Sequence, residues 1–172
     1  MSEFHRLVEQ QIPRLRRYAR GLTRNADRAD DLVQETLLRA IAKSHLWQTG
    51  TDLRAWLFTI MHNQHVNLVR KSMREEPAVD ITQFSSSLVA NTDPTASRQL
   101  RELERALGCI REEQREAILL VGLEGMSYED AAQILNVPIG TVRSRLSRGR
   151  DALRSLMDMP ERGSQEPFAE AA

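Results

Sequence analysis

Apolar residues recur at steps of three and four along most of the chain, and this spacing constrains the fold more than any other feature. In the first half it predicts helices from about Phe4 to Leu22, from Asn25 to Lys43 and from Leu53 to Met73. Pro13 interrupts the first pattern, so we expect it to kink that helix or to begin a second one. Runs of β-branched residues typical of strands are missing. The sequence therefore predicts an all-α fold.

The second half begins with a helix-start signal and ends in a helix-turn-helix pattern. Asp93 and Pro94 are typical of an N-cap and a first helical position, and helices are predicted to about Ile110 and from Glu113 to Leu123. Residues 127–130 resemble a capping box that opens a short helix. A turn at 136–138 follows, and then a longer helix with one apolar face. Together these features predict a helix-turn-helix from Ser127 to about Leu156.

Charge is distributed unevenly although the chain carries 24 basic and 24 acidic residues. A net charge of zero argues against nucleic-acid binding, but the distribution matters more than the sum. Residues 1–75 are basic, residues 76–97 contain no lysine or arginine, and five arginines lie between Arg143 and Arg154. We therefore predict two small helical domains, at 1–75 and 96–159, joined by a flexible acidic linker at 76–95 and followed by a disordered tail at 160–172.

The last helix carries the residues best suited to reading DNA. Arg143, Ser144, Ser147 and Arg148 lie outside its apolar face. Arginine can bond a guanine edge with two donors, and serine hydroxyls serve bases or phosphates. The simpler interpretation is a solvated basic face, and charge alone does not exclude it. Because the cap, the turn and the apolar spacing occur together, we predict major-groove binding.

Two further polar faces lie in the first half. Asp31, Gln34, Glu35 and Leu38 share one side of their helix, which is either a solvated face or a docking face; periodicity does not decide between them. The third helix combines asparagines with Arg70 and Lys71 and follows a loop around a glycine. Such amides and cations suit unpaired DNA, whose bases stack or flip into pockets.

Catalysis and metal binding find little support in the sequence. His62 and His65 lie three residues apart, and with Asp31 and Glu35 they suggest a metal hydrolase as a third class of function. However, no third ligand has convincing spacing, and neither a phosphate loop nor a nucleophile–base pair is evident. We therefore predict no catalytic residue, no metal and no cofactor.

The single cysteine and the lack of long apolar runs indicate the compartment. One cysteine, Cys109, allows no internal disulfide, and its neighbours Leu107 and Ile110 predict a buried structural role for it. No stretch resembles a signal peptide or is long enough to cross a bilayer. We expect a cytoplasmic protein without membrane insertion.

Several motifs occur in one order that is similar to a known family. Two of these motifs precede the linker: an acidic helix at 29–36 and a Leu-Arg-Ala-Trp-Leu-Phe helix at 53–58. The third follows the linker, and it is a Gly-Thr-Val-Arg-Ser-Arg-Leu helix at 140–146. This order resembles the extracytoplasmic-function (ECF) sigma factors of bacterial RNA polymerase, within the sigma-70 family. The amino-acid sequences of residues 26–37 and 50–57 are similar to those of the general-stress type of alphaproteobacteria. The likeness covers about 4–74 and 98–157.

The resemblance implies a role for each matching residue. The first domain would be region 2-like, docking on the β′ clamp of core polymerase and engaging the −10 element. The second would be region 4-like, meeting the β flap and reading the −35 element. The implied docking residues are Asp31, Gln34, Glu35, Leu38 and Arg39. The implied −10 residues are Thr49, Gly50, Thr51, Arg54, Asn63, Asn67, Arg70 and Lys71. The implied −35 residues are Thr141, Arg143, Ser144, Arg145, Ser147 and Arg148.

The resemblance also implies partners and an alternative. A sigma factor of this type has core RNA polymerase, promoter DNA and an inhibitory anti-sigma factor as partners. The linker would thread towards the polymerase active site and exit channel. Ser147 stands where many relatives carry a bulky residue, so the base read there is open. The alternative is a stand-alone helix-turn-helix regulator, which would bind duplex DNA alone, usually as a dimer on a palindrome.

Overall fold

The computed structural model describes residues 2–75 and 93–157 of the 172-residue chain. Every regular element in these two ranges is helical, as predicted. Residues 76–92 of the predicted linker lie outside the described residues. The predicted disordered tail lies wholly outside them.

The first half forms three α-helices and one short 3₁₀ turn. Helix α1 spans Glu3–Thr23, α2 spans Ala26–Ala42, η1 spans Ser44–Leu46 and α3 spans Leu53–Glu75. Helix α1 runs through Pro13 without a break, so a second helix starting there is wrong. The Asn25 side chain caps α2, and Asp52 Oδ1 accepts a hydrogen bond of 3.1 Å from the Ala55 amide at the start of α3. These caps confirm the predicted helix boundaries.

The second half contains four α-helices and a π turn. Helix α4 spans Pro94–Cys109, α5 spans Glu112–Ile118, the π turn η2 spans Leu119–Leu123, α6 spans Tyr128–Leu135 and α7 spans Ile139–Leu156. Asp93 caps α4 as predicted. The helix predicted up to Leu123 widens at its end, because the Glu124 amide bonds the Leu119 carbonyl, five residues back. Gly125, at φ +66°, then ends it.

The burial predicted for Cys109 is wrong. Its side chain is exposed at the last turn of α4, whereas Ala106 and Ile110 turn inward and are buried. The apolar neighbours correctly indicated a core contact for this turn. They did not indicate which residue of the turn makes it.

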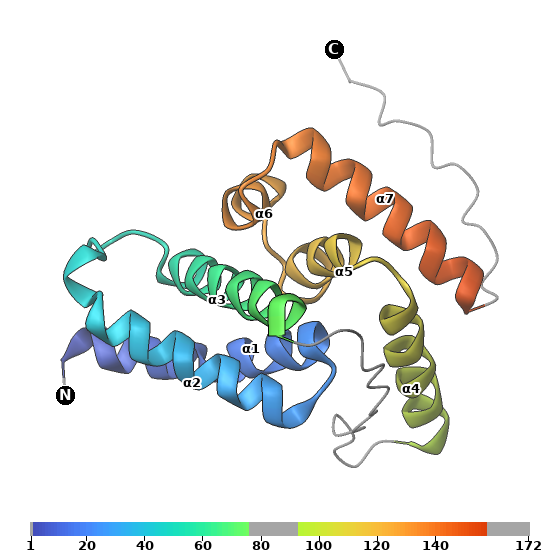
Figure 1. Ribbon diagram of the computed structural model, residues 1–172, viewed down its shortest axis with the longest axis horizontal. Coiled ribbons are helices and arrows are strands. Elements are labelled where there is room, and N and C mark those ends of the chain that lie inside the picture. Colours follow the sequence, from blue (N-terminus) through green and yellow to red (C-terminus); the bar gives the residue numbers. More distant parts are fainter. Residues whose placement is uncertain (1, 76–92, 158–172) are drawn as a thin grey trace.

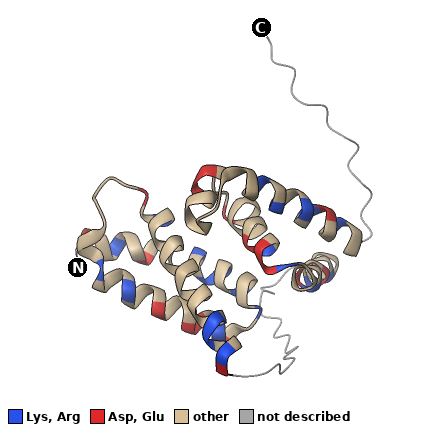
Figure 2. Cartoon of the chain, turned by 45° about the horizontal axis from the view of Figure 1, so that its top comes forward, with Lys and Arg blue, Asp and Glu red and all other residues tan. Residues whose placement is uncertain are grey.

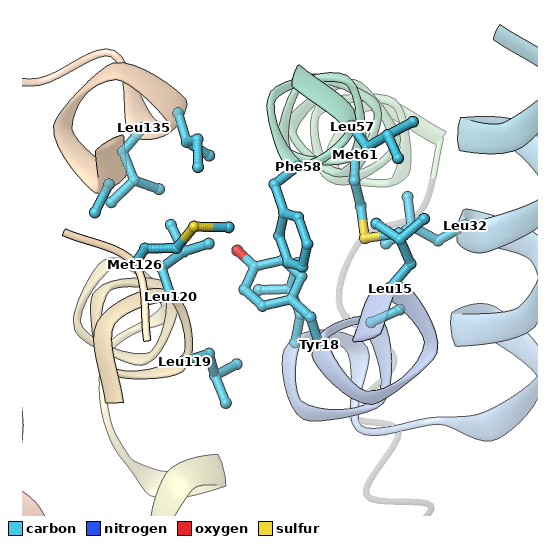
Figure 3. Packing of buried hydrophobic residues seen from close by; sticks show 14 of the residues in the cluster. Leu15, Tyr18, Leu32, Leu57, Phe58, Met61, Leu119, Leu120, Met126 and Leu135 are labelled. Atoms are coloured by element: carbon cyan, nitrogen blue, oxygen red, sulfur yellow. The ribbon is translucent and has the colours of Figure 1, made fainter. Parts of the chain in front are cut away.

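The two halves pack directly on each other around one shared core. Figure 1 shows α3 lying beside α5 and α6. Helix α1 packs against the π turn. Tyr18 of α1 and Phe58 of α3 are fully buried, with ring centroids 5.1 Å apart. In Figure 3 these rings lie between Leu120 and Met126 on one side and Leu15 on the other. The buried apolar side chains of both halves therefore form a single cluster.

Close approach between the halves depends on a glycine of α1. A Cβ atom at Gly21 would lie 2.8 Å from Leu119 Cδ2, closer than packed carbon atoms allow. The absence of a side chain there lets the π turn rest against α1. The position therefore favours a small residue for packing, independently of its backbone angles.

A buried carboxylate fixes the polar border of this contact. Glu124, directly after the π turn, is 4% exposed and accepts hydrogen bonds of 2.9 and 3.0 Å from the Arg17 guanidinium. Arg54 of α3 donates a further hydrogen bond of 3.3 Å to the Glu124 carbonyl. The pKa of Arg17 is raised, mainly by its hydrogen bond to Glu124. One residue of the second half thus binds two helices of the first half.

We predict that Glu124→Gln lowers the free energy of unfolding by about 1–3 kcal/mol, because it removes the charged acceptor from a hydrogen-bonded pair. Urea denaturation followed by circular dichroism measures the change. Glu9→Gln is the matched control, since Glu9 is exposed on α1. Equal stability of the two variants would contradict the importance assigned to the Arg17–Glu124 pair.

Candidate nucleic-acid interface

Helices α6 and α7 form the predicted helix-turn-helix. Ser127 Oγ accepts a hydrogen bond of 3.0 Å from the Asp130 amide and caps α6. Asn136 takes the left-handed conformation, at φ 54°, and ends α6 two residues before Pro138. A Cβ atom at Gly149 would lie 2.7 Å from Ile118 Cδ1, so this glycine lets α7 pack closely on α5. The inner face of α7 is fixed by this packing.

The outer face of α7 presents the predicted −35 residues. Arg143, Ser147 and Arg148 are exposed, whereas Thr141, Ser144 and Arg145 are half-buried. In Figure 2 several positions along this helix carry the blue of basic residues. The structure therefore brings these residues onto one element.

Two local contacts orient side chains near the start of α7. The Arg143 guanidinium carbon lies 5.8 Å from the centroid of the Tyr128 ring of α6, a cation–π distance. Ser144 Oγ donates a 3.1 Å hydrogen bond to the Thr141 carbonyl, which leaves the lone pairs of the hydroxyl free to accept. Both contacts reduce the freedom that these side chains would lose on binding a base edge.

The predicted −10 residues are divided by the structure. Asn63, Asn67 and Arg70 are exposed at helical spacing on α3, with Lys71 beside them. The loop residues 49–51 are also exposed, and Gly50 takes φ +93°, which favours glycine. Arg54 lies apart from both groups, because its guanidinium bonds the Glu124 carbonyl.

The predicted docking face on α2 is open to solvent. Asp31, Gln34 and Arg39 are exposed, and Arg39 Nε lies 2.8 Å from Glu35 Oε1. Leu38 is 65% exposed among these charged neighbours.

Ile41, which apolar spacing alone assigns to the core, is 45% exposed one turn after Leu38. Sequence reasoning missed this residue, although its position three residues after Leu38 was a usable signal. The pair forms a small exposed apolar patch within a charged helix face.

The two histidines of α3 do not lie beside Asp31 and Glu35, the carboxylates with which the sequence suggested a metal site. Asp31 and Glu35 lie on the open face of α2, whereas His62 and His65 are buried against Glu116 and Glu112 of α5. The hydrogen bond with His65 lowers the pKa of Glu112.

Among the helices of 2–75 and 93–157, none combines the length and apolar character needed to cross a bilayer.

Known proteins match the chain over both halves. The family model for the Sigma2 domain of PhyR matches residues 8–62, and the model for region 4 of sigma-70 matches residues 100–153. The ECF RNA polymerase sigma factor EcfG of Rhodopseudomonas palustris is 45% identical over 146 residues, covering 85% of this chain and 80% of that protein. The ECF sigma factor SigE of Mycolicibacterium smegmatis is 34% identical over 91% of this chain and 62% of its own length.

Solved structures agree with the sequence relatives. The sigma factor RpoE in complex with the anti-sigma factor NepR from Bartonella quintana superposes with a TM-score of 0.81 at 36% identity, covering 94% of this chain and all of that one. CnrH in complex with the cytosolic domain of CnrY gives a TM-score of 0.65 at 26% identity, covering 92% and 89%. The RpoE match agrees with the resemblance to the general-stress type. The chain therefore belongs to the ECF sigma factors of bacterial RNA polymerase, and both of its predicted functional regions are those of that family.

Proposed function

We propose that three separate surfaces of this chain divide the work of promoter recognition. The exposed face of α2 docks on core polymerase, α3 and its preceding loop hold the melted −10 element, and α7 reads the −35 element. The domains would be residues 1–75 and 96–159. The observation that carries the proposal is the exposure of polar and basic residues on α3 and on α7, on different domains of one chain. The chain would act in the cytoplasm and carry out no catalysis of its own.

Reading of the −35 element follows from the geometry of α7. Arg143 lies in the first turns of the helix, where a recognition helix meets base edges, and its contact with Tyr128 holds it near one orientation. Ser147 is exposed one turn later. Arg150, farther along the helix, is better placed for phosphates.

Melting of the −10 element requires sites for unpaired bases. Opening and flipping a base costs a few kcal/mol, which contacts to the displaced strand must offset. The amides of Asn63 and Asn67 offer both donors and acceptors, and Arg70 and Lys71 supply charge for the backbone. These four residues lie on one exposed face of α3, so a single strand can contact them together.

Docking on the polymerase would use Leu38 as an apolar anchor. Its exposed side chain loses contact with water when a partner covers it, at about 25 cal/mol per Å². The surrounding Asp31, Gln34 and Arg39 would set the orientation through charge and hydrogen bonds. RpoE and CnrH were solved with anti-sigma factors, and we propose that a comparable partner covers the α2 face or the −35 helix of this chain.

Promoter binding would require the two domains to separate. The −10 and −35 elements are about 25 base pairs apart by their positions, or about 85 Å along B-DNA. Helix α3 has 23 residues and α7 has 18, so laid end to end they reach only about 60 Å. In this structure α3 packs on α6, which leads directly into α7, and we call this the closed arrangement. In the closed arrangement the two helices are too near each other to contact both elements at once.

We predict that opening accompanies polymerase and promoter binding. Fluorescent labels on the exposed Cys109 and on an Asp27→Cys variant report the separation of the domains. Energy transfer should fall when core polymerase and promoter DNA are added, and should stay unchanged with bovine serum albumin as control. Unchanged transfer in an initiation-competent complex would contradict the opening step.

Run-off transcription on a promoter library tests the function itself. Core polymerase with this chain should initiate at a defined subset of promoters that core enzyme alone ignores. Leu38→Asp should abolish the effect, because it places a charge at the proposed anchor. Leu156→Asp is the matched control, since Leu156 is likewise exposed, at 52%. Initiation that is the same with and without the chain would refute the proposal.

Arg143→Ala tests the reading of a base. If Arg143 bonds a base with two donors, its loss should weaken recognition by about 1–3 kcal/mol at one upstream base pair and relax specificity there. Binding of the holoenzyme to singly substituted promoters measures this. Arg150→Ala should instead weaken all promoters alike, and a uniform loss for Arg143→Ala would make Arg143 a phosphate contact.

A further inference from the structure

Two histidines of α3 face two glutamates of α5 across the contact between the domains. His62 and His65 lie three residues apart and Glu112 and Glu116 four apart, so each pair occupies one face of its helix. His65 Nε2 contacts a Glu112 carboxylate oxygen, and His62 Nδ1 lies 3.5 Å from Glu116 Oε1. Ligand atoms of His65, Glu112 and Glu116 all lie within 4.8 Å of one another. We call these four residues the His–Glu cluster.

One nitrogen of this cluster has no hydrogen-bond partner among the described residues. His62 is 8% exposed, and its Nδ1 atom is buried without a hydrogen-bond partner in the described part of the chain. Buried polar atoms in folded proteins almost always have a partner. The Nδ1 atom points to Glu116 but does not bond it. The His62 Nδ1 atom is therefore a buried nitrogen that faces the Glu116 carboxylate and could serve as a metal ligand.

Charge at the cluster also favours a cation. Two carboxylates approach each other here, and Glu116 is 6% exposed. Arg115, the adjacent residue of α5, donates its hydrogen bonds to the backbone carbonyls of Leu107, Ile110 and Leu22, and its charge adds to the effect of His65 in lowering the pKa of Glu112. A cation bound beside two closely placed carboxylates, one buried and one partly exposed, stabilises their charges.

We propose that the His–Glu cluster binds one Zn²⁺ ion between the two domains. Two imidazole nitrogens and two carboxylate oxygens are a donor set suited to zinc in a four-coordinate site. Bonds of 2.0–2.2 Å place tetrahedral ligand atoms roughly 3.4 Å apart, and the His62–Glu116 separation of 3.5 Å already matches that edge. His62 lies outside the group of three residues whose ligand atoms are all within 4.8 Å of one another, so its imidazole must rotate about its side-chain torsions to complete the site.

The site also has a route for the ion and a structural consequence. The Glu112 side chain is 41% exposed, so zinc can enter from that side and displace the proton of the His65–Glu112 hydrogen bond. An ion held by both helices would join α3 to α5 and stabilise the closed arrangement. This inference does not depend on the proposed function, because binding is measured without polymerase or DNA. The sequence analysis considered the histidines together with Asp31 and Glu35, whereas the structure places them against Glu116 and Glu112.

Calorimetric titration of tag-free, chelator-treated full-length chain with zinc sulfate tests the proposal. We expect one Zn²⁺ per chain and a rise in the midpoint of thermal unfolding on loading. His65→Gln and Glu116→Gln should each weaken binding by at least about tenfold, since each removes a ligand. The Co²⁺-loaded chain should show the intense visible absorption of tetrahedral coordination, which reports the ligands in the unaltered protein even if a variant fails to fold.

Matched controls separate this site from other surface ligands. His45→Gln and Glu113→Gln remove the same chemical groups from exposed positions and should bind zinc as the unaltered chain does. Absence of stoichiometric binding would overturn the proposal. Equal binding by all four variants would also overturn it, because zinc would then lie elsewhere. Equal affinity for Mg²⁺ would instead indicate a general acidic site and likewise count against it.

Discussion

The packing of the second domain on Tyr18 and Phe58 is the contact on which the rest of the described structure depends. These rings join the apolar faces of α1 and α3 to the π turn and to α6 in one core. Burial raises the pKa of Tyr18 well above its usual range, with smaller contributions from nearby carboxylates such as Glu116. The hydroxyl therefore stays neutral, and the core carries no charge at its centre.

Polar groups around that core give the contact its specific geometry. An apolar surface alone allows sliding, whereas Arg17 with Glu124 and the His–Glu cluster pair defined atoms at separate points. Within residues 2–75 and 93–157, the same arrangement leaves the outer faces of α2, α3 and α7 exposed. This arrangement therefore leaves the faces proposed to contact the −10 and −35 elements exposed at the same time.

Local signals in the sequence were sufficient for the helices and most of the candidate site. The caps Asn25, Asp52 and Ser127 mark helix starts by chemistry that depends on neighbouring residues only. The exposed residues of α7 followed from the apolar spacing of its other face. Contacts between residues far apart in sequence were inaccessible in this way: the burial of His62 and the role of Arg54 depend on α5 and Glu124, about 50 to 70 positions later.

The π turn after α5 sets the direction in which Glu124 leaves the helix. Compared with continuous α-helix, a π turn accommodates one extra residue, and each residue of an α-helix turns the chain by about 100°. Glu124 comes directly after this turn and reaches Arg17 from there. A deletion of one residue within Leu119–Leu123 would swing this carboxylate away from α1. The placement of Glu124 opposite Arg17 is thus determined by a single residue of helical register.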